Sequence, residues 1–186
     1  MAIRFYKVSE EYGCFSNFSL HPITLEDKVW PTSEHYFQAQ KFPSEPDYQE
    51  EMRNAARPHD VAKMGRDRSY TLRPDWENVK DDLMRLAVLQ KFADYEDIRS
   101  VLLSTGDKDI IEVTTNDYYW GEGTKKTGKN MLGVILMEVR DALRGQEKFL
   151  DRIDEVTSAM HGNSLANEPN PAVEYHEGIL SRLGKN

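Results

Sequence analysis

Residues with the chemistry of a catalyst are concentrated in one short segment, 30–42, which reads WPTSEHYFQAQKF. Pro31 followed by two hydroxyl residues is typical of a helix start, because either hydroxyl can cap the first turn. At about 100° per residue, the helix places Glu34, Gln38 and Lys41 on one stripe between aromatic residues. If the stripe faces inward, it costs folding energy unless its polar groups pair or meet a ligand.

The stripe has two interpretations, and spacing alone favours neither. Turned outward, Glu34 and Lys41 are ordinary solvated charges two turns apart. Turned inward, Glu34 lies in the first turn, where the positive end of the helix dipole favours its ionised form. An ionised carboxylate suits a base, or a group that stabilises positive charge, better than a general acid.

The charge distribution restricts the kind of ligand. The net charge is −8, which argues against a broad grip on duplex nucleic acid, because that grip depends on neutralising phosphates. Residues 53–73 differ, with six basic residues against two acidic ones. Such a basic patch on an acidic protein suits a compact phosphate-bearing ligand. Any single arginine or lysine of the patch, taken alone, is more simply explained as an ordinary surface charge.

The composition is that of an ordinary protein of one domain, with 186 residues, 39% of them hydrophobic. No apolar run approaches the roughly 20 residues of a membrane span, and the N-terminus lacks a signal-peptide pattern. Cys14 is the one cysteine, so we expect a cytoplasmic location, no disulfide and no cysteine metal cluster. The histidines show no metal-ligand spacing, and we expect no metal or redox cofactor.

Short strands and longer helices are expected along the chain. Strands are predicted at 3–8 and 110–114, a hairpin at 23–30, and helices at 44–56, 58–64, after Asp75, at 95–103 and after Asn130. Asp75 and Asn130 are the expected caps of their helices. Residues 146–160 continue as a helix, 161–171 are expected to be linker or disorder, and a small apolar cluster near residue 180 is expected to dock locally.

Several motifs, taken in order, resemble one known family. They read EYG, FSNF, WPTSEHYFQAQKF, MGR, LRxxW, NDxYWG and GKNxLG, between about Ile3 and Leu143. The set is similar to the NADAR family, also called YbiA-like. The resemblance implies a helix-dominated α+β domain with a small β-sheet or hairpin and N-glycosidase (N-glycosyl hydrolase) activity. We therefore expect that domain over 1–145, and a helix with a flexible tail over 146–186.

The family is associated with two substrate classes. One comprises ribosylated pyrimidine intermediates of riboflavin synthesis, and the other is guanine, free or in nucleic acid, that carries ADP-ribose on its exocyclic amine. Both contain a bond between ribose C1′ and an exocyclic amine, so one chemistry serves both. The guanine class implies transient, salt-sensitive contact with DNA or RNA.

Cleavage of this bond requires an oxocarbenium-like sugar to be stabilised or captured, and a proton for the leaving amine. Glycosidases commonly use two carboxylates for this, and on the resemblance we assign Glu34 and Asp117. Asp117 precedes Tyr118, Tyr119 and Trp120, whose rings can stack a base or exclude water. Without the resemblance, a turn after a strand explains Asp117 equally well.

Lys41 offers a second route, which we favour slightly over direct attack by water. A ribosylamine can open to an imine, and a desolvated lysine can exchange onto that imine as a Schiff base. Phe37 and Phe42 are the residues expected to desolvate the amine and lower its pKa.

Eight further positions are predicted to contact substrate. Two arginines offer bidentate geometry for phosphate, two aromatic residues stack the nucleobase, two asparagines read its polar edges, and two glycines allow close approach. In that order they are Arg66 and Arg73, Phe18 and Trp120, Asn17 and Asn130, and Gly121 and Gly133. Each of two residues also has a structural explanation. Asn17 could instead hydrogen-bond to backbone groups within a turn, and Gly133 could instead allow another backbone segment to approach its helix.

A non-enzymatic alternative is a module that binds ADP-ribose or a nucleotide. It would be stabilised by its ligand and would show no turnover. The presence of both Glu34 and Lys41 favours catalysis.

Overall fold

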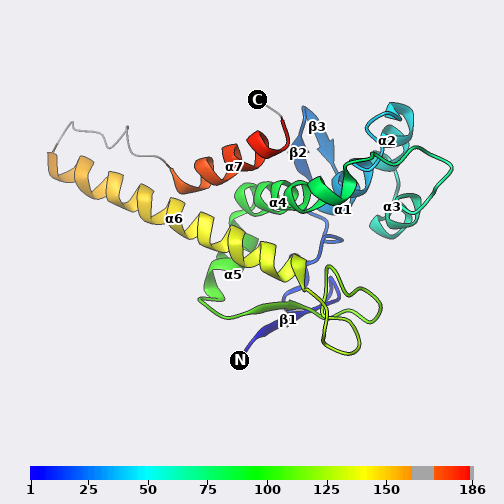
Figure 1. The fold of residues 1–186 in the computed structure, drawn as a ribbon. Helices are drawn as coiled ribbons and strands as arrows, with labels where there is room; N and C mark the ends of the chain where they lie inside the picture. Colours follow the sequence, from blue (N-terminus) through cyan, green and yellow to red (C-terminus); the bar gives the residue numbers. More distant parts are fainter. Residues whose placement is uncertain (161–169, 185–186) are drawn as a thin grey trace.

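The computed structural model describes residues 1–160 and 170–184 (Figure 1). Within these ranges seven α-helices accompany two small β-sheets, which confirms the helix-dominated α+β class. None of the described helices is long and apolar enough to cross a membrane. The elements are β1 (Ile3–Phe5), the 3-10 turn η1 (Gly13–Phe15), β2 (Ile23–Leu25), β3 (Lys28–Trp30), α1 (Ser33–Ala39), α2 (Pro46–Arg53), α3 (Pro58–Met64), α4 (Trp76–Asp94), α5 (Glu96–Ser104), β4 (Ile110–Glu112), α6 (Met131–Met160) and α7 (Pro171–Arg182).

The two sheets join different parts of the chain. β1 and β4 are far apart in sequence and form a parallel pair in which Phe5 lies opposite Glu112. β2 and β3 form the predicted hairpin. Its two turn residues, Glu26 and Asp27, have φ of 56° and 57°, as a tight turn between twisted strands requires. The hairpin delivers the chain directly to α1.

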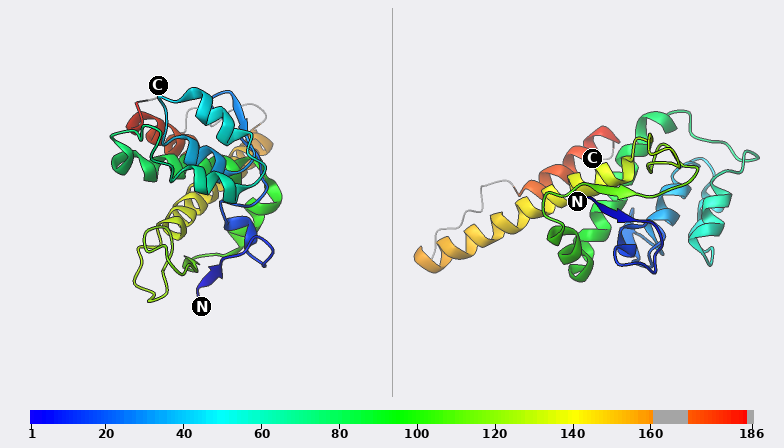
Figure 2. Two further views of the ribbon diagram at one scale, coloured as in Figure 1. Left: turned by 90° about the vertical axis from the view of Figure 1, so that its right-hand side faces the viewer. Right: turned by 90° about the horizontal axis from the view of Figure 1, so that it is seen from below.

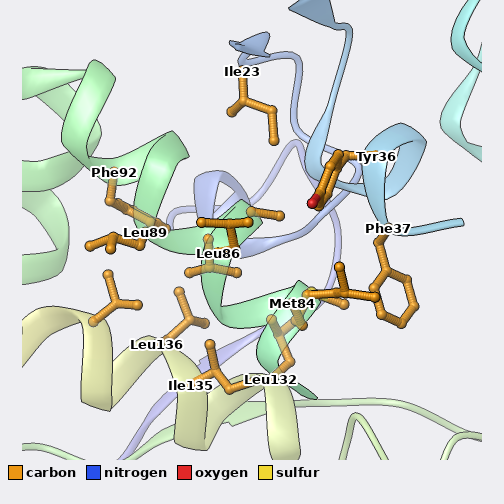
Figure 3. Close-up of a cluster of buried hydrophobic side chains, with 14 of the residues drawn as sticks. Ile23, Tyr36, Phe37, Met84, Leu86, Leu89, Phe92, Leu132, Ile135 and Leu136 are labelled. Atoms are coloured by element: carbon orange, nitrogen blue, oxygen red, sulfur yellow. The ribbon is translucent and has the colours of Figure 1, made fainter. Parts of the chain in front are cut away.

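The core is centred on α4. It is contacted by α1, α5, α6, α7 and β2. Figure 3 shows the side chains of α4, among them Leu86 and Leu89, between those of α1 and α6. Fully burying an aliphatic side chain of this size contributes roughly 1.5–3 kcal/mol, so this cluster holds α1, and the residues it carries, in a fixed place.

Helix α1 resolves the two interpretations of the 30–42 segment. It begins at Ser33, as predicted, and the hydroxyl of Thr32 accepts a hydrogen bond from the backbone N–H of His35. All seven of its residues are buried, so Glu34 and Gln38 face inward. The helix ends at Ala39, sooner than predicted, because the chain tightens into turns after it. Lys41 therefore lies beyond the helix and is not the last member of a helical stripe.

Two predicted helix caps have other partners. The carboxylate of Asp75 makes no capping bond to α4 and accepts two hydrogen bonds from Arg73 instead. The side chain of Asn130 accepts from the backbone N–H of Glu112 at 2.9 Å and donates to the carbonyl of Ile110 at 2.8 Å. Asn130 thus fastens β4 to the start of α6, a role that only the tertiary structure reveals.

The C-terminal part adds a helix to the core. α6 continues without a break through residue 145 as far as Met160, and its far end projects beyond the other elements (Figures 1 and 2). α7 runs back beside α6 and α4, with Ile179 fully buried, which confirms the predicted local docking. Most of the predicted linker, 161–169, lies outside the described residues. Its last two residues cap and begin α7.

Candidate active site

One cavity of about 240 Å³ collects most of the predicted site residues. It is bounded by the turn after η1, by α1, by the segment after α3 and by β4 with the loop that follows it. Three carboxylic acids, three aromatic rings, two amides and an arginine line its wall, together with smaller residues. They are Glu34, Glu112 and Asp117; Phe18, Phe37 and Trp120; Asn17 and Gln38; and Arg66.

Glu34 is 7% exposed, and its Oε1 accepts a hydrogen bond of 2.8 Å from the amide of Gln38 one turn later. Burial raises the pKa of Glu34 to about 7. This effect outweighs the hydrogen bond from Gln38 and the charges of Lys41 and Arg66, all of which lower the pKa. Burial therefore opposes the ionisation expected from the position of Glu34 in the first turn of the helix. A carboxyl group with this pKa suits a general acid at neutral pH.

Asp117 faces the same cavity from the loop after β4. Its Oδ1 accepts hydrogen bonds from the backbone N–H groups of Tyr119 and Trp120 at 2.8 and 2.7 Å. This is the turn geometry expected of a loop aspartate. Asp117 therefore serves a structural turn and also lines the cavity, because the turn fixes its carboxylate at the cavity wall.

Glu112 was not predicted as a site residue. It ends β4 and lines the cavity, and its side chain makes no hydrogen bond to a described residue. Burial, together with the charges of Asp117 and Glu34, raises its pKa to about 7. In the sequence Glu112 is an ordinary strand residue, and no spacing relates it to Glu34, so only the parallel pairing of β4 with β1 places it here.

Two buried amide oxygens beside the cavity have no hydrogen-bond partner among the described residues. Asn17 and Gln38 are 8% and 9% exposed, and Oδ1 of Asn17 and Oε1 of Gln38 are buried without a hydrogen bond. The amide nitrogen of Asn17 donates to the sulfur of Met84 at 3.2 Å. Buried acceptors without donors are costly, and the oxygen of Gln38 packs against Gly65, where an added Cβ would lie 1.8 Å from it.

The turn that carries Asn17 is held by a buried lysine. Lys91 of α4 is 1% exposed and donates a hydrogen bond of 2.9 Å to the carbonyl of Ser16. No carboxylate of a described residue pairs with this amine, and burial lowers its pKa to about 7. The bond positions Asn17 and Phe18 relative to α4.

Lys41 borders the cavity without lining it. Its Nζ donates to the carbonyl of Gly65 at 3.2 Å and lies 5.3 Å from the ring centre of Trp76 and 6.0 Å from that of Phe37. Burial lowers the pKa of Lys41 to about 8, against the opposing charge of Glu34. The two rings beside the amine are therefore Phe37 and Trp76. Phe42 was predicted in place of Trp76, but it packs against Tyr48 and Tyr70.

Aromatic contacts make the wall of the cavity rigid. Phe37 packs edge-on against Trp120, with ring centres 5.2 Å apart, and against Trp76 at 5.0 Å. Phe37 thus separates Lys41, on the Trp76 side, from the cavity, on the Trp120 side.

Three of the six basic residues in the patch 53–73 are paired with carboxylates. Arg53 pairs with Glu50 and Arg57 with Asp60. Arg73, predicted to bind phosphate, is held by Asp75 and does not line the cavity. Arg66 differs, because its side chain is exposed at the cavity and forms no hydrogen bond or ion pair within the described residues. The patch therefore contributes chiefly one arginine to the site.

Three other predicted contact residues serve the fold around the cavity. A Cβ at Gly133 would lie 2.1 Å from the carbonyl oxygen of Ile110, and one at Gly121 would lie 2.4 Å from the hydroxyl of Thr114. These glycines allow backbone to approach backbone or side chain, and Asn130 fastens β4. None of the three lines the cavity. Across the described residues, no group of three or more His, Cys, Asp or Glu is arranged to hold a metal ion.

Comparison with known proteins assigns the fold and the motifs to one family. The NADAR domain model matches residues 4–144. Over 141 residues the chain is 51% identical to N-glycosidase YbiA of Escherichia coli (strain K12), which covers 76% of this chain and 88% of that protein. The chain belongs to the NADAR family. The NMR structure of E. coli YbiA superimposes with a TM-score of 0.72 at 50% identity, over 77% of this chain and 85% of that one.

Other NADAR relatives carry two kinds of name. An N-glycosidase of Nostoc punctiforme is 49% identical over 146 residues, 77% of this chain and 94% of that protein. The riboflavin biosynthesis protein PYRR of Zea mays is 38% identical over 157 residues, 77% of this chain and 25% of that longer protein. With N-glycosidases at about half identity over most of its length, this NADAR protein is a glycosyl hydrolase, which decides against a module that only binds.

Proposed function

We propose that the enzyme removes ADP-ribose from guanine, free or within DNA or RNA, by cleaving the bond between ribose C1′ and the exocyclic amine. The observation that carries the proposal is the cluster of three carboxyl groups, Glu34, Glu112 and Asp117, in one ring-lined cavity. Such a cluster can stabilise a positively charged sugar and also supply a proton. Transient contact with nucleic acid and a cytoplasmic location belong to the same proposal.

The size of the cavity determines which part of the substrate it encloses. Pockets that enclose whole drug-sized ligands measure roughly 300–1,000 Å³, and this cavity measures about 240 Å³. It therefore suits the reacting ribose, and the rest of the nucleotide lies at the opening. Arg66, exposed and unpaired by described residues, is placed to bind the phosphate groups there.

In the hydrolytic route, Glu34 acts in its protonated form. As the C1′–N bond breaks, the proton of Glu34 passes to the leaving amine, and the electron pair of the bond stays on nitrogen. Water adds to C1′ and gives a proton to Asp117, which its two backbone hydrogen bonds hold in place. The products are guanine with a free amine and ADP-ribose with a C1′ hydroxyl group.

In the Schiff-base route, Lys41 is the nucleophile. The ribose ring opens as the nitrogen lone pair forms a C1′=N bond and the C1′–O4′ electrons take a proton. Neutral Lys41 then adds to C1′, and the protonated amine leaves, so that an imine links the sugar to the enzyme until water releases it. The lowered pKa of about 8 supplies neutral amine, and the amine must first leave the carbonyl of Gly65.

The test of the reaction is product analysis on ADP-ribosylated guanosine. We expect release of guanosine and ADP-ribose, with a loss in kcat on the order of 10²-fold or more for Glu34→Gln, because a positioned proton donor contributes that much. Glu77→Gln is the matched control, since Glu77 lies exposed on α4 away from the cavity. Absence of guanosine from the wild-type reaction would refute the proposal.

A second candidate substrate follows from the name of the maize relative. Phosphoribosyl aminopyrimidines of riboflavin synthesis contain the same kind of C1′–N bond. The two candidates are distinguished by kcat/KM of the wild-type enzyme on both substrates under the same conditions. We expect the ADP-ribosylated guanosine to be preferred, and the reverse order would assign the enzyme to the pyrimidine.

The two routes are distinguished by borohydride, which reduces an imine to a stable amine. Addition during turnover is expected to leave the sugar attached to the peptide that contains Lys41, as seen by mass spectrometry. Lys41→Ala is expected to keep its fold and lose both activity and label, whereas Lys63→Ala, on the exposed face of α3, keeps both. An unmodified Lys41 in an enzyme that is turning over would exclude the Schiff base and leave direct hydrolysis.

A further inference from the structure

A second hollow adjoins the cavity on the side of β1. It measures about 450 Å³ and is lined by Tyr6, Lys7, Val8, Ser16, Phe18 and Glu112. Ser16, Phe18 and Glu112 also line the cavity, so the two spaces share a wall and meet at these residues. We call this second hollow the β1 groove.

The β1 groove exposes apolar groups that the fold does not use. Tyr6 is 50% exposed and Val8 is 46% exposed. The ring of Tyr6 makes no hydrogen bond or ring contact with any described residue, although the neighbouring backbone is fixed by the pairing of β1 with β4. A rigid support with an uncovered aromatic ring is what base stacking requires.

We propose that the β1 groove is the subsite for the aromatic base attached to the leaving amine, with Tyr6 and Phe18 as its stacking surfaces. The inference rests on the proposed function, because it takes the ribose to be in the cavity. Two observations support it: the cavity is too small for a whole nucleotide, and the groove shares Ser16, Phe18 and the carboxyl group of Glu112 with the cavity.

The two ends of the substrate then bind on different sides. Arg66 follows α3 and lines the cavity but not the groove, whereas Tyr6 follows β1 and lines the groove but not the cavity. α3 and β1 lie well apart in Figures 1 and 2. Phosphate groups therefore extend toward Arg66 and the base toward Tyr6, with C1′ between them beside Glu112, whose carboxyl oxygens can accept N–H groups of the base.

The test uses two pairs of variants on ADP-ribosylated guanosine. Tyr6→Ala is expected to raise KM roughly 10-fold, the effect of one lost stacking contact, and to leave kcat within about two-fold, while Tyr6→Phe keeps the ring and restores KM. Val8→Ala is expected to raise KM by a smaller factor. Val29→Ala, an equally exposed valine on β3, is expected to change nothing. An unchanged KM in Tyr6→Ala would overturn the subsite and leave the proposed function intact.

A binding measurement keeps the inference testable if the proposed reaction fails. Guanosine 5′-monophosphate contains the base without the scissile bond, and its affinity for the wild-type protein is measurable by NMR titration. We expect signals of residues 6–8 and 16–18 to shift, and the Kd to rise roughly 10-fold in Tyr6→Ala. No binding, or equal binding by both proteins, would overturn the subsite whatever the catalytic result.

Discussion

At the scale of single residues, burial and a neighbouring carboxylate set the protonation of two glutamates in the small cavity. The pKa values of Glu34 and Glu112 both rise to about 7, chiefly through burial, and Asp117 adds to both shifts. Carboxyl groups this close to one another retain a proton at neutral pH more readily than separate ones. An acid for the leaving amine is therefore available without a histidine.

The first prediction concerns this coupling. A negative neighbour raises a carboxyl pKa, so Glu34→Gln is expected to lower the pKa of Glu112 from about 7. The measurement is a pH titration of the side-chain carboxyl signals by NMR in glutamate-labelled protein. In the wild type, kcat is expected to decline above about pH 7, because Glu34 loses the proton that it must donate. A Glu112 titration that is the same in both proteins would contradict a shared cavity.

The second prediction compares two arginines of the 53–73 patch. Arg66→Met is expected to raise KM for ADP-ribosylated guanosine by roughly 10- to 100-fold, since a hydrogen bond to a charged group contributes about 1.5–3 kcal/mol. Arg73→Met is expected to leave KM nearly unchanged, because Asp75 already holds that guanidinium outside the cavity. Equal effects of the two changes would show that Arg66 is not the phosphate contact.

At the scale of elements, the site depends on how the start of α6 lies against β4. Asn130 bonds to the backbone of β4 on both sides of Ile111, and Gly133 brings the helix close to the carbonyl of Ile110. β4 ends in Glu112, and the loop after it carries Asp117. The contact of α6 with β4 thus supports the strand that also pairs with β1 and that carries Glu112 and leads to Asp117.

The third prediction tests that contact. Gly133→Ala introduces a methyl group that would lie 2.1 Å from a backbone oxygen, so α6 and β4 must separate. We expect a loss of about 1–3 kcal/mol in the free energy of unfolding, measured with urea, and a loss of kcat as Glu112 moves. Gly178→Ala is the control, because a Cβ at that helical glycine in α7 would meet only the Arg182 guanidinium, at 3.9 Å, and alanine there is expected to stabilise by up to about 1 kcal/mol.

At the scale of the whole molecule, burial of an ionisable group near the site lowers the free energy of unfolding at pH values where the group would be charged in water. Lys91 is fully buried with a pKa of about 7, far below its ordinary value of 10.5. Between these two pH values the unfolded chain holds the proton and the folded protein does not. The free energy of unfolding therefore rises with pH in this window.

The fourth prediction follows from this rise of the free energy of unfolding with pH. The stability of the wild type relative to Lys91→Met is expected to increase from pH 7 to pH 9 by on the order of 2 kcal/mol. Urea unfolding of both proteins at the two pH values measures it. Lys41 titrates in the same direction but is present in both proteins and cancels. A difference that does not vary with pH would mean that Lys91 stays charged in the folded protein.

The sequence by itself determined the local structure and the family. Patterns of apolar residues, prolines and glycines predicted the hairpin and most helices. The resemblance to the NADAR family assigned Glu34 and Asp117 to one site, whereas spacing alone left the orientation of Glu34 open. These features depend on neighbours in the chain, which a sequence displays directly. The early end of α1, which removes Lys41 from the helical stripe, depends on packing and was not predictable in this way.

Only the tertiary structure decided which polar groups share the cavity and how they are charged. Glu112 reaches the site through the pairing of β4 with the distant β1, Arg73 is withdrawn by Asp75, and burial raises the pKa of Glu34 to about 7. Each of these depends on desolvation and on contacts between residues far apart in the chain. Such quantities are set by the packed molecule as a whole, because the dielectric surroundings of a side chain exist only once the fold has formed.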